Sequence, residues 1–106
     1  MEDPVLVTKP VEVVDNLSRD RFELWLSGPS RTFVGFLGYT TREPGVYELQ
    51  HTIIDEAFGR QGYARTLVTK VLQQLEEREE KIIPVCSYVQ RYLERFPQFG
   101  SLVAEQ

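Results

Sequence analysis

A short segment with the sequence FGRQGYA, residues 58–64, holds residues whose types and spacing could bind a ligand. Gly59 and Gly62 are three positions apart, and an apolar helical stripe begins just after them. Glycines let the backbone approach a ligand closely, and the first N–H groups of a helix attract an anion. Arg60 and Arg65 add positive charge. The segment indicates an anion-binding turn, although an ordinary strand-to-helix turn has a similar composition.

Two further residues could take part in proton or group transfer. Cys86 is the only cysteine, so the chain can form no internal disulfide and no zinc site of thiolates, and we expect no metal. Its thiol is either a nucleophile or a small packing residue. His51 is the only histidine, and strand alternation places it on the face of Tyr47, Leu49 and Ile53. It is therefore either a general base or a hydrogen-bonded core histidine.

The length and charge narrow the class of protein. A chain of 106 residues has room for one domain, and a net charge of -4 argues against broad binding to nucleic acid or anionic membranes. It has no signal segment and no apolar run of about 20 residues, so we expect a cytoplasmic protein. Between Ala57 and Leu75 the charged residues are Arg60, Arg65 and Lys70. This acid-free island is either a solvated face or the binding site of a small anion.

Apolar alternation predicts strands before and after these residues. The first four expected strands are separated by short polar or Pro-Gly turns, and they cover residues 11–16, 22–26, 32–41 and 46–54. Connections this short join antiparallel neighbours. A fifth, buried strand is expected at Ile82–Val85. It follows a helix, and a strand-helix-strand crossover of this length makes a parallel pair.

Two helices are expected in the second half of the chain. Apolar residues spaced by three and one give a helical stripe from about Tyr63 to Glu80. Ser87 and Gln90 have the spacing of a capping box, and the helix that they begin ends at Pro97. The predicted class is α/β of the α+β type, with a mostly antiparallel sheet, one parallel strand pair and two main helices.

The order of these motifs resembles the GNAT superfamily of acyl-CoA-dependent N-acetyltransferases. Their phosphate-binding signature is Gln/Arg-x-x-Gly-x-Gly/Ala, which Gly62 and Ala64 match, whereas Gly59 stands at its first position. The similarity is greatest to a minimal, single-domain subgroup. The further motifs of that subgroup are present as His51-Thr52, Pro84-Val85-Cys86, Ser87-Tyr88-Val89 and Phe96-Pro97. The resemblance covers about residues 22–103 and implies one domain over 1–106, with its core at about 11–103.

The resemblance implies that acetyl-CoA, or coenzyme A, binds as a cosubstrate in the splay between the fourth and fifth strands. The pantetheine arm would lie along the backbone of Ile53 and Ile54, and the thioester would lie near Cys86. Tyr88 is on the last helix, where larger members place a tyrosine that protonates the leaving thiolate. It also fits the apolar, core-facing side of that helix. The expected pyrophosphate-binding residues are Gly59, Arg60, Gln61, Gly62, Tyr63, Ala64 and Arg65.

The implied function is transfer of an acetyl group to an unidentified amine or protein acceptor, by a monomer or weak dimer. A second hypothesis is a CoA-binding or protein-interaction module without catalysis. It is motivated by Ile53, which stands where the subgroup often has Glu, and by a chain too short to enclose an acceptor. A third is a thiol-based redox sensor that uses Cys86.

Overall fold

The computed structural model describes residues 2–105 and contains five strands and two α-helices. This confirms the predicted element order. The strands are β1 (Val11–Asn16), β2 (Arg21–Leu26), β3 (Thr32–Glu43), β4 (Val46–Ile54) and β5 (Lys81–Pro84). The α-helices are α1 (Tyr63–Glu77) and α2 (Ser87–Arg95), and three short 3₁₀ turns are η1 (Leu17–Arg19), η2 (Glu56–Phe58) and η3 (Pro97–Leu102).

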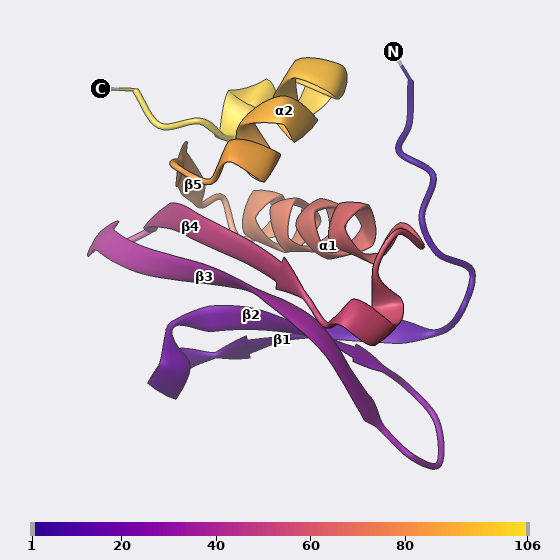
Figure 1. Cartoon of the computed structure of the whole chain (residues 1–106). Coiled ribbons are helices and arrows are strands. Elements are labelled where there is room, and N and C mark those ends of the chain that lie inside the picture. The colour runs from indigo at the N-terminus through magenta and orange to yellow at the C-terminus, as the bar shows by residue number, and fades with distance from the viewer. Residues whose placement is uncertain (1, 106) are drawn as a thin grey trace.

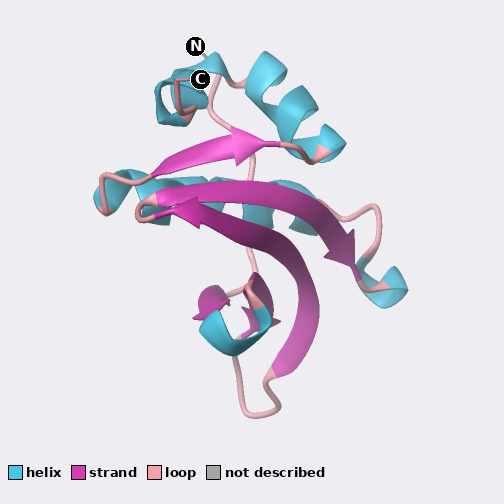
Figure 2. Cartoon of the chain, turned by 90° about the vertical axis from the view of Figure 1, so that its left-hand side faces the viewer, coloured by secondary structure: helices cyan, strands magenta, loops and turns pink. Residues whose placement is uncertain are grey.

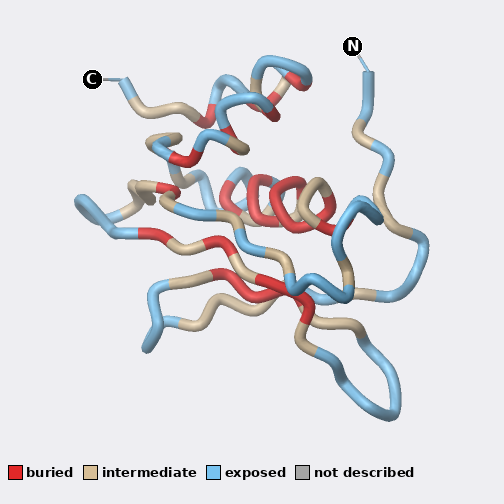
Figure 3. The backbone as a smooth tube through the Cα atoms, viewed as in Figure 1, coloured by how far each residue is buried: buried red, intermediate tan, exposed pale blue. Residues whose placement is uncertain are grey.

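The strands form one sheet in the order β1-β2-β3-β4-β5 (Figure 1). Strands β1 to β4 are antiparallel neighbours, and β5 is parallel to β4. Helix α1 connects β4 to β5 and lies behind the strands in Figure 2, with α2 at the β5 edge. The buried residues run along α1 and the sheet face toward it, as Figure 3 shows. The fold is therefore the mixed sheet with one parallel pair that the sequence predicts.

A β-bulge in β4 changes which side chains face the core. Gly38 of β3 pairs with His51, but the next residue, Tyr39, pairs with Leu49, so Gln50 is an extra residue in β4. Leu49 is fully buried, whereas His51 and Ile53 are exposed. The interpretation of His51 as a core histidine is therefore wrong. The inserted residue reverses the alternation, and His51 leaves the face of Leu49.

The two parallel strands separate just after the bulge. Their pairing ends at Leu49 and Pro84, where the Leu49 carbonyl accepts hydrogen bonds from the N–H groups of Val85 at 3.1 Å and Cys86 at 2.8 Å. Beyond this point β4 continues along β3 alone. A Cβ atom on Gly35 of β3 would lie 2.4 Å from the Ile53 carbonyl oxygen, so only glycine allows this approach. The end of β4 is thus held by β3 and leaves its other edge unpaired by β5.

The start of α2 differs from the predicted capping box. Cys86, with an extended φ of -62° and ψ of 124°, is the N-cap residue, and it makes no side-chain capping bond. Gln90 Nε2 donates instead to the Pro84 carbonyl at 2.9 Å and to the Val85 carbonyl at 3.4 Å. The capping-box prediction is wrong because Ser87 is already helical, which puts Cys86 at the junction between strand and helix.

The last residues add an edge contact that the alternation does not reveal. Val103 forms an isolated parallel bridge with Ile82, and the Ala104 N–H donates to the Ile82 carbonyl at 2.8 Å. The chain after η3 therefore covers part of the outer edge of β5. None of the helices in residues 2–105 has the length and apolar character that a membrane crossing requires.

Candidate functional site

The loop between β4 and α1 is built by local hydrogen bonds. The Asp55 carboxylate accepts from the Ala57 N–H at 2.9 Å and begins the η2 turn. Gln61 Nε2 donates back to the Ala57 carbonyl at 3.2 Å. Arg60 has a φ of 60° and Gly62 a φ of 90°, both in the left-handed region. These two residues turn the chain so that α1 begins directly after Gly62.

The first turn of α1 presents backbone donors beside basic side chains. Gly62 is the N-cap residue, and the next N–H groups have no carbonyl partner within the helix. The positive end of the helix dipole lies there as well. The Thr66 hydroxyl donates to the Gly62 carbonyl at 3.0 Å and accepts from the Val7 N–H at 3.0 Å, which fixes this end of the helix. The arrangement can hold an anion in front of the helix.

A pocket of about 460 Å³, here called the loop pocket, lies at this turn. Seven of the nine predicted cofactor-binding residues line it, and Gln61 and Ile53 do not. Its lining residues are Ile54, Phe58, Gly59, Arg60, Gly62, Tyr63, Ala64, Arg65 and Tyr88. The pocket combines two arginines, a helix N-terminus and aromatic walls, so it can accept an anionic group joined to an apolar one.

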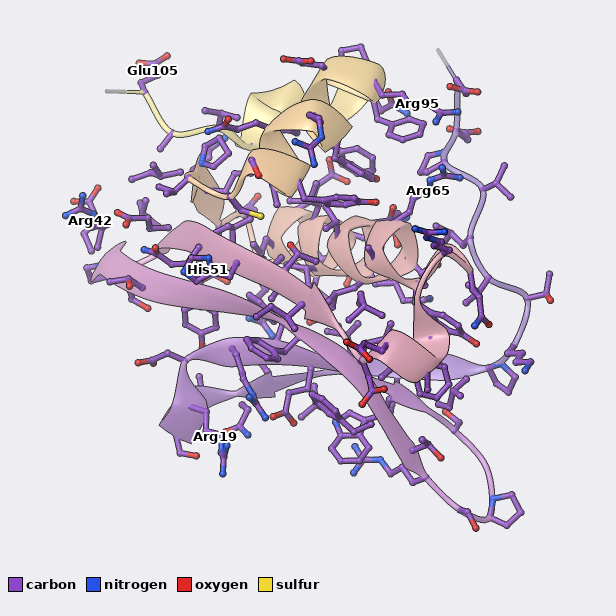
Figure 4. The ribbon with its side chains drawn as sticks, in the orientation of Figure 1. Arg19, Arg42, His51, Arg65, Arg95 and Glu105 are labelled. Carbon is purple, nitrogen blue, oxygen red and sulfur yellow. The ribbon has the colours of Figure 1, made fainter. Side chains whose placement is uncertain are left out.

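A second pocket of about 560 Å³, the strand pocket, lies where β4 and β5 separate. It contains the three predicted catalytic residues, His51, Cys86 and Tyr88, and also Ile53. The other lining residues are Gln50, Thr52, Val85, Ser87 and Arg91. Tyr88 lines both pockets, so the glycine turn and the cysteine belong to one stretch of surface. In Figure 4 His51 lies on the β4 ribbon beside this region.

Cys86 is nearly buried, with 6% of its surface exposed. Its Sγ atom lies 3.4 Å from the Thr52 Oγ1 atom on β4, a hydrogen bond in which either atom can donate. Its N–H is held by the Leu49 carbonyl. The thiol therefore sits between the two diverging strands, at the N-cap of α2, with a hydroxyl as its polar neighbour.

The two tyrosines of α2 differ in their surroundings. Tyr92 is buried, and its hydroxyl lies 2.6 Å from the Thr69 Oγ1 atom, so it belongs to the core. Tyr88 is half-buried at the junction of the pockets. Burial raises the pKa of Tyr88, while nearby arginines act to lower it. A tyrosine hydroxyl is protonated near neutral pH even at its ordinary pKa of about 10, as a proton donor requires.

A sequence model of the GCN5-related N-acetyl-transferase family matches residues 21–102, which include both pockets. The chain belongs to this family. The resemblance found in the motifs is thus confirmed, and the matched range agrees with the predicted one within a residue.

Two relatives are consistent with this GCN5-related membership. Protein NATD1 from Gallus gallus is 27% identical over 88 residues, which are 83% of this chain and 78% of that protein. A GCN5-like protein from Staphylococcus aureus, with an NMR solution structure, has a TM-score of 0.63 at 19% identity. That alignment covers 90% of this chain and 89% of the other. It shows that the GCN5-related fold is shared.

The structure brings residues to this GCN5-related site that the candidate set leaves out. Thr52 touches the thiol, Phe58 forms a wall of the loop pocket, and Arg91 lines the strand pocket. Thr52 belongs to the His-Thr motif, so the sequence contained a pattern that could have identified it as a site residue. Arg91 had none, because a basic residue on a short helix looks the same whether it lines a pocket or faces water.

Proposed function

We propose that this protein binds acetyl-CoA and transfers its acetyl group to an amine. The observation that carries the proposal is the continuity of the two pockets through Tyr88, from the glycine turn to Cys86. One end suits a pyrophosphate and the other holds a thiol, a histidine and a tyrosine. A thioester linked to a diphosphate by a long flexible arm is the ligand chemistry that fits both ends.

In this proposal the pyrophosphate accepts hydrogen bonds from the backbone of residues 61–65, and Arg60 and Arg65 supply charge. Gly59 lets the backbone come close. The arm lies along the edge of β4 at Ile53 and Ile54, which β5 leaves unpaired after Leu49 and Pro84. An extended amide-containing arm can add to such an edge through backbone hydrogen bonds, as an extra strand would.

The transfer needs a base, an acid and a path for the acetyl group. We assign His51 to remove a proton from the amine and Tyr88 to donate one to the leaving CoA sulfur. In the direct path the amine nitrogen forms the C–N bond as the thioester C–S bond of acetyl-CoA breaks. In the path through Cys86, Sγ first takes the acetyl group and its proton ends on the released CoA thiol; the amine then forms the C–N bond as the bond to Sγ breaks, which restores the Cys86 thiol. The second path is supported by the contact of Sγ with Thr52 Oγ1 and by its place at a helix N-terminus.

A second candidate function is a CoA-binding or protein-interaction module without transferase activity. It is favoured by the lining of the strand pocket, in which Ile53 is 52% exposed and Val85 49% exposed. No carboxylate is among the residues that line that pocket. An open apolar rim without a carboxylate base fits docking as well as catalysis.

Isothermal titration calorimetry with acetyl-CoA tests binding, and release of free CoA measured against a panel of primary amines and basic peptides tests transfer. Binding with release supports the transferase. Binding without release for any acceptor supports the non-catalytic module. No binding at millimolar acetyl-CoA would exclude the transferase and a CoA-binding module, and would leave only a protein-interaction module. We further propose a cytoplasmic, monomeric or weakly dimeric protein, which cell fractionation and sedimentation can check.

A further inference from the structure

A third pocket, of about 220 Å³, lies between the first turn of α1 and helix α2. We call it the arginine pocket because three of its six lining residues are arginines and none is acidic. They are Arg65, Tyr88, Arg91, Tyr92, Arg95 and Phe96. It shares Arg65 and Tyr88 with the loop pocket, so the two are neighbours.

The three arginines come together from two helices. Arg91 and Arg95 are one turn apart on α2, and Arg65 is in the first turn of α1. Figure 4 shows Arg65 and Arg95 on the same side of the molecule, beside the N-terminal segment. All three act on the hydroxyl of Tyr88, whose pKa they lower against the effect of burial. Like charges that line one small pocket repel one another unless an anion lies between them.

The partners found for these arginines leave most of their charge available. Arg65 Nη1 donates to the Val5 carbonyl at 3.4 Å, a long bond to a neutral group. Arg95 Nε lies 3.3 Å from a Glu2 carboxylate oxygen, and both side chains are more than half exposed. Within residues 2–105, Arg91 has no acidic partner within ion-pair distance. Exposed pairs of this kind hold weakly, so a phosphate can displace them.

The floor of the pocket is rigid and aromatic. Tyr92 is fixed by its hydroxyl contact with Thr69, and its ring centroid lies 4.9 Å from that of Phe96. The Arg95 guanidinium carbon lies 5.3 Å from the centroid of the Phe96 ring, which holds this side chain against the floor. One guanidinium group held over a fixed floor, with two more lining the same pocket, favours a compact, doubly charged anion.

We propose that the arginine pocket binds the 3′-phosphate of coenzyme A, so that the protein selects the 3′-phosphorylated cofactor over dephospho-CoA. This inference rests on the proposed function, in which the loop pocket holds the pyrophosphate. The 3′-phosphate is carried by the ribose attached to that pyrophosphate, and Arg65 lines both pockets. Arg91 and Arg95 are then specificity residues for the 3′-phosphate, and they have no part in holding the pyrophosphate.

Titration of CoA and of 3′-dephospho-CoA by calorimetry tests the inference on the full chain. We expect dephospho-CoA to bind wild-type protein about tenfold more weakly, as loss of a charge-assisted phosphate contact predicts. Arg95→Gln, at a residue that lines the arginine pocket and neither of the other two pockets, should weaken CoA about tenfold and leave dephospho-CoA within about twofold, so the preference disappears. Arg91 also lines the strand pocket, so Arg91→Gln should weaken both ligands, but CoA about tenfold more than dephospho-CoA, and the preference should again disappear. Arg19→Gln removes the same charge from the distant η1 turn, shown in Figure 4, and should keep the preference.

The outcomes separate the inference from the proposed function. Equal binding of the two ligands to wild-type protein would overturn the inference and leave the proposed function standing. An equal loss of both ligands in Arg91→Gln and Arg95→Gln would also overturn it, because these residues would then contact another part of the ligand. Binding of neither ligand to the wild type would remove the proposed function and the inference together. Both residues are exposed, and a thermal melt of each variant checks its fold.

Discussion

The Oγ1 atom of Thr52 and the Sγ atom of Cys86 lie 3.4 Å apart, across the point where β4 and β5 separate. The contact joins the His-Thr motif on one strand to the Pro-x-Cys motif after the other, 34 residues later in the chain. It gives the only thiol of the chain a hydroxyl partner in a nearly buried position. A hydroxyl in this place can stabilise a thiolate that attacks a thioester.

We expect incubation with acetyl-CoA to give an acetylated Cys86 peptide by mass spectrometry, labile to hydroxylamine. Thr52→Val removes the hydroxyl and should slow this acetylation about tenfold, the effect of losing one hydrogen bond to a charged group. Thr52→Ser keeps the hydroxyl and should acetylate at close to the wild-type rate. An unmodified Cys86, together with full turnover in Cys86→Ala, would show that the thiol is a neighbour of the reaction and no nucleophile.

Ala64→Glu tests the loop pocket without straining the backbone. Ala64 lines the pocket in the first turn of α1, where a carboxylate is compatible with the helix dipole and should not destabilise the fold. The same carboxylate would repel a pyrophosphate, so we expect acetyl-CoA affinity to fall more than about a hundredfold. Ala64→Gln has nearly the same size without the charge.

Calorimetry on the two Ala64 variants separates charge from bulk. A loss much larger for Glu than for Gln supports an anion at this helix end. Equal losses in the two variants would assign the effect to steric exclusion, and unchanged affinity in both would remove the pyrophosphate from the loop.

The sequence predicts the fold well because the strands and α1 are set by patterns that extend over many residues. The apolar residues alternate along β2 and recur every three or four residues along α1. Each pattern gives its element one apolar face, and these faces are buried in the core between the sheet and the helix. Two local predictions fail for a shared reason. The β4 bulge at Gln50 and the N-cap at Cys86 each depend on how two strands pair and separate, which no local pattern encodes.

The candidate site is predicted in part. The glycine turn is recognisable because glycine spacing, a helix start and positive charge occur within one short segment. Arg91 and Arg95 are not recognisable, because their place beside Arg65 depends on how α2 packs against α1. Only the tertiary structure brings these cations to one pocket.

Glu23 provides a pH-dependent contribution to stability. It is 6% exposed, and its carboxylate accepts hydrogen bonds from Asn16 at 3.0 Å, Arg21 at 2.7 Å and Trp25 at 3.2 Å. Burial acts to raise the pKa of Glu23, but the hydrogen bonds outweigh it and the net pKa is lowered. A carboxyl with a lowered folded pKa stabilises the fold above its unfolded pKa, and this is lost as the pH falls through the folded value.

We therefore expect Glu23→Gln to lower the free energy of unfolding by about 1–3 kcal/mol at pH 7. The difference from wild type should shrink as the pH falls below the unfolded-state pKa of glutamate, about 4.3, and through the lowered pKa of the folded state. Urea denaturation from pH 7 to pH 3 measures both curves. Glu12→Gln is the control, since Glu12 pairs with Arg31 while both side chains are about half exposed. A pH-independent difference at Glu23 would contradict the prediction.

The end of α1 offers a stabilising substitution. Glu79 has a φ of 58°, and the Glu80 N–H closes the helix by donating to the Leu75 carbonyl at 2.9 Å. This is the position where helices commonly carry glycine, because glycine adopts the left-handed conformation without strain. Glu79→Gly should raise the free energy of unfolding by about 0.5–1 kcal/mol, measured by urea denaturation at pH 7.

Glu77→Gly is matched to Glu79→Gly in charge and residue type. Glu77 is the last residue of α1, with helical backbone, so glycine there should destabilise the protein by up to about 1 kcal/mol. Each variant removes one glutamate carboxylate, at positions two residues apart, and the two should change the free energy of unfolding in opposite directions. Their unfolding free energies therefore report backbone conformation, since the change in net charge is common to both. Destabilisation by both variants would contradict the prediction. It would mean that the Glu79 side chain stabilises the fold by more free energy than its left-handed backbone conformation costs.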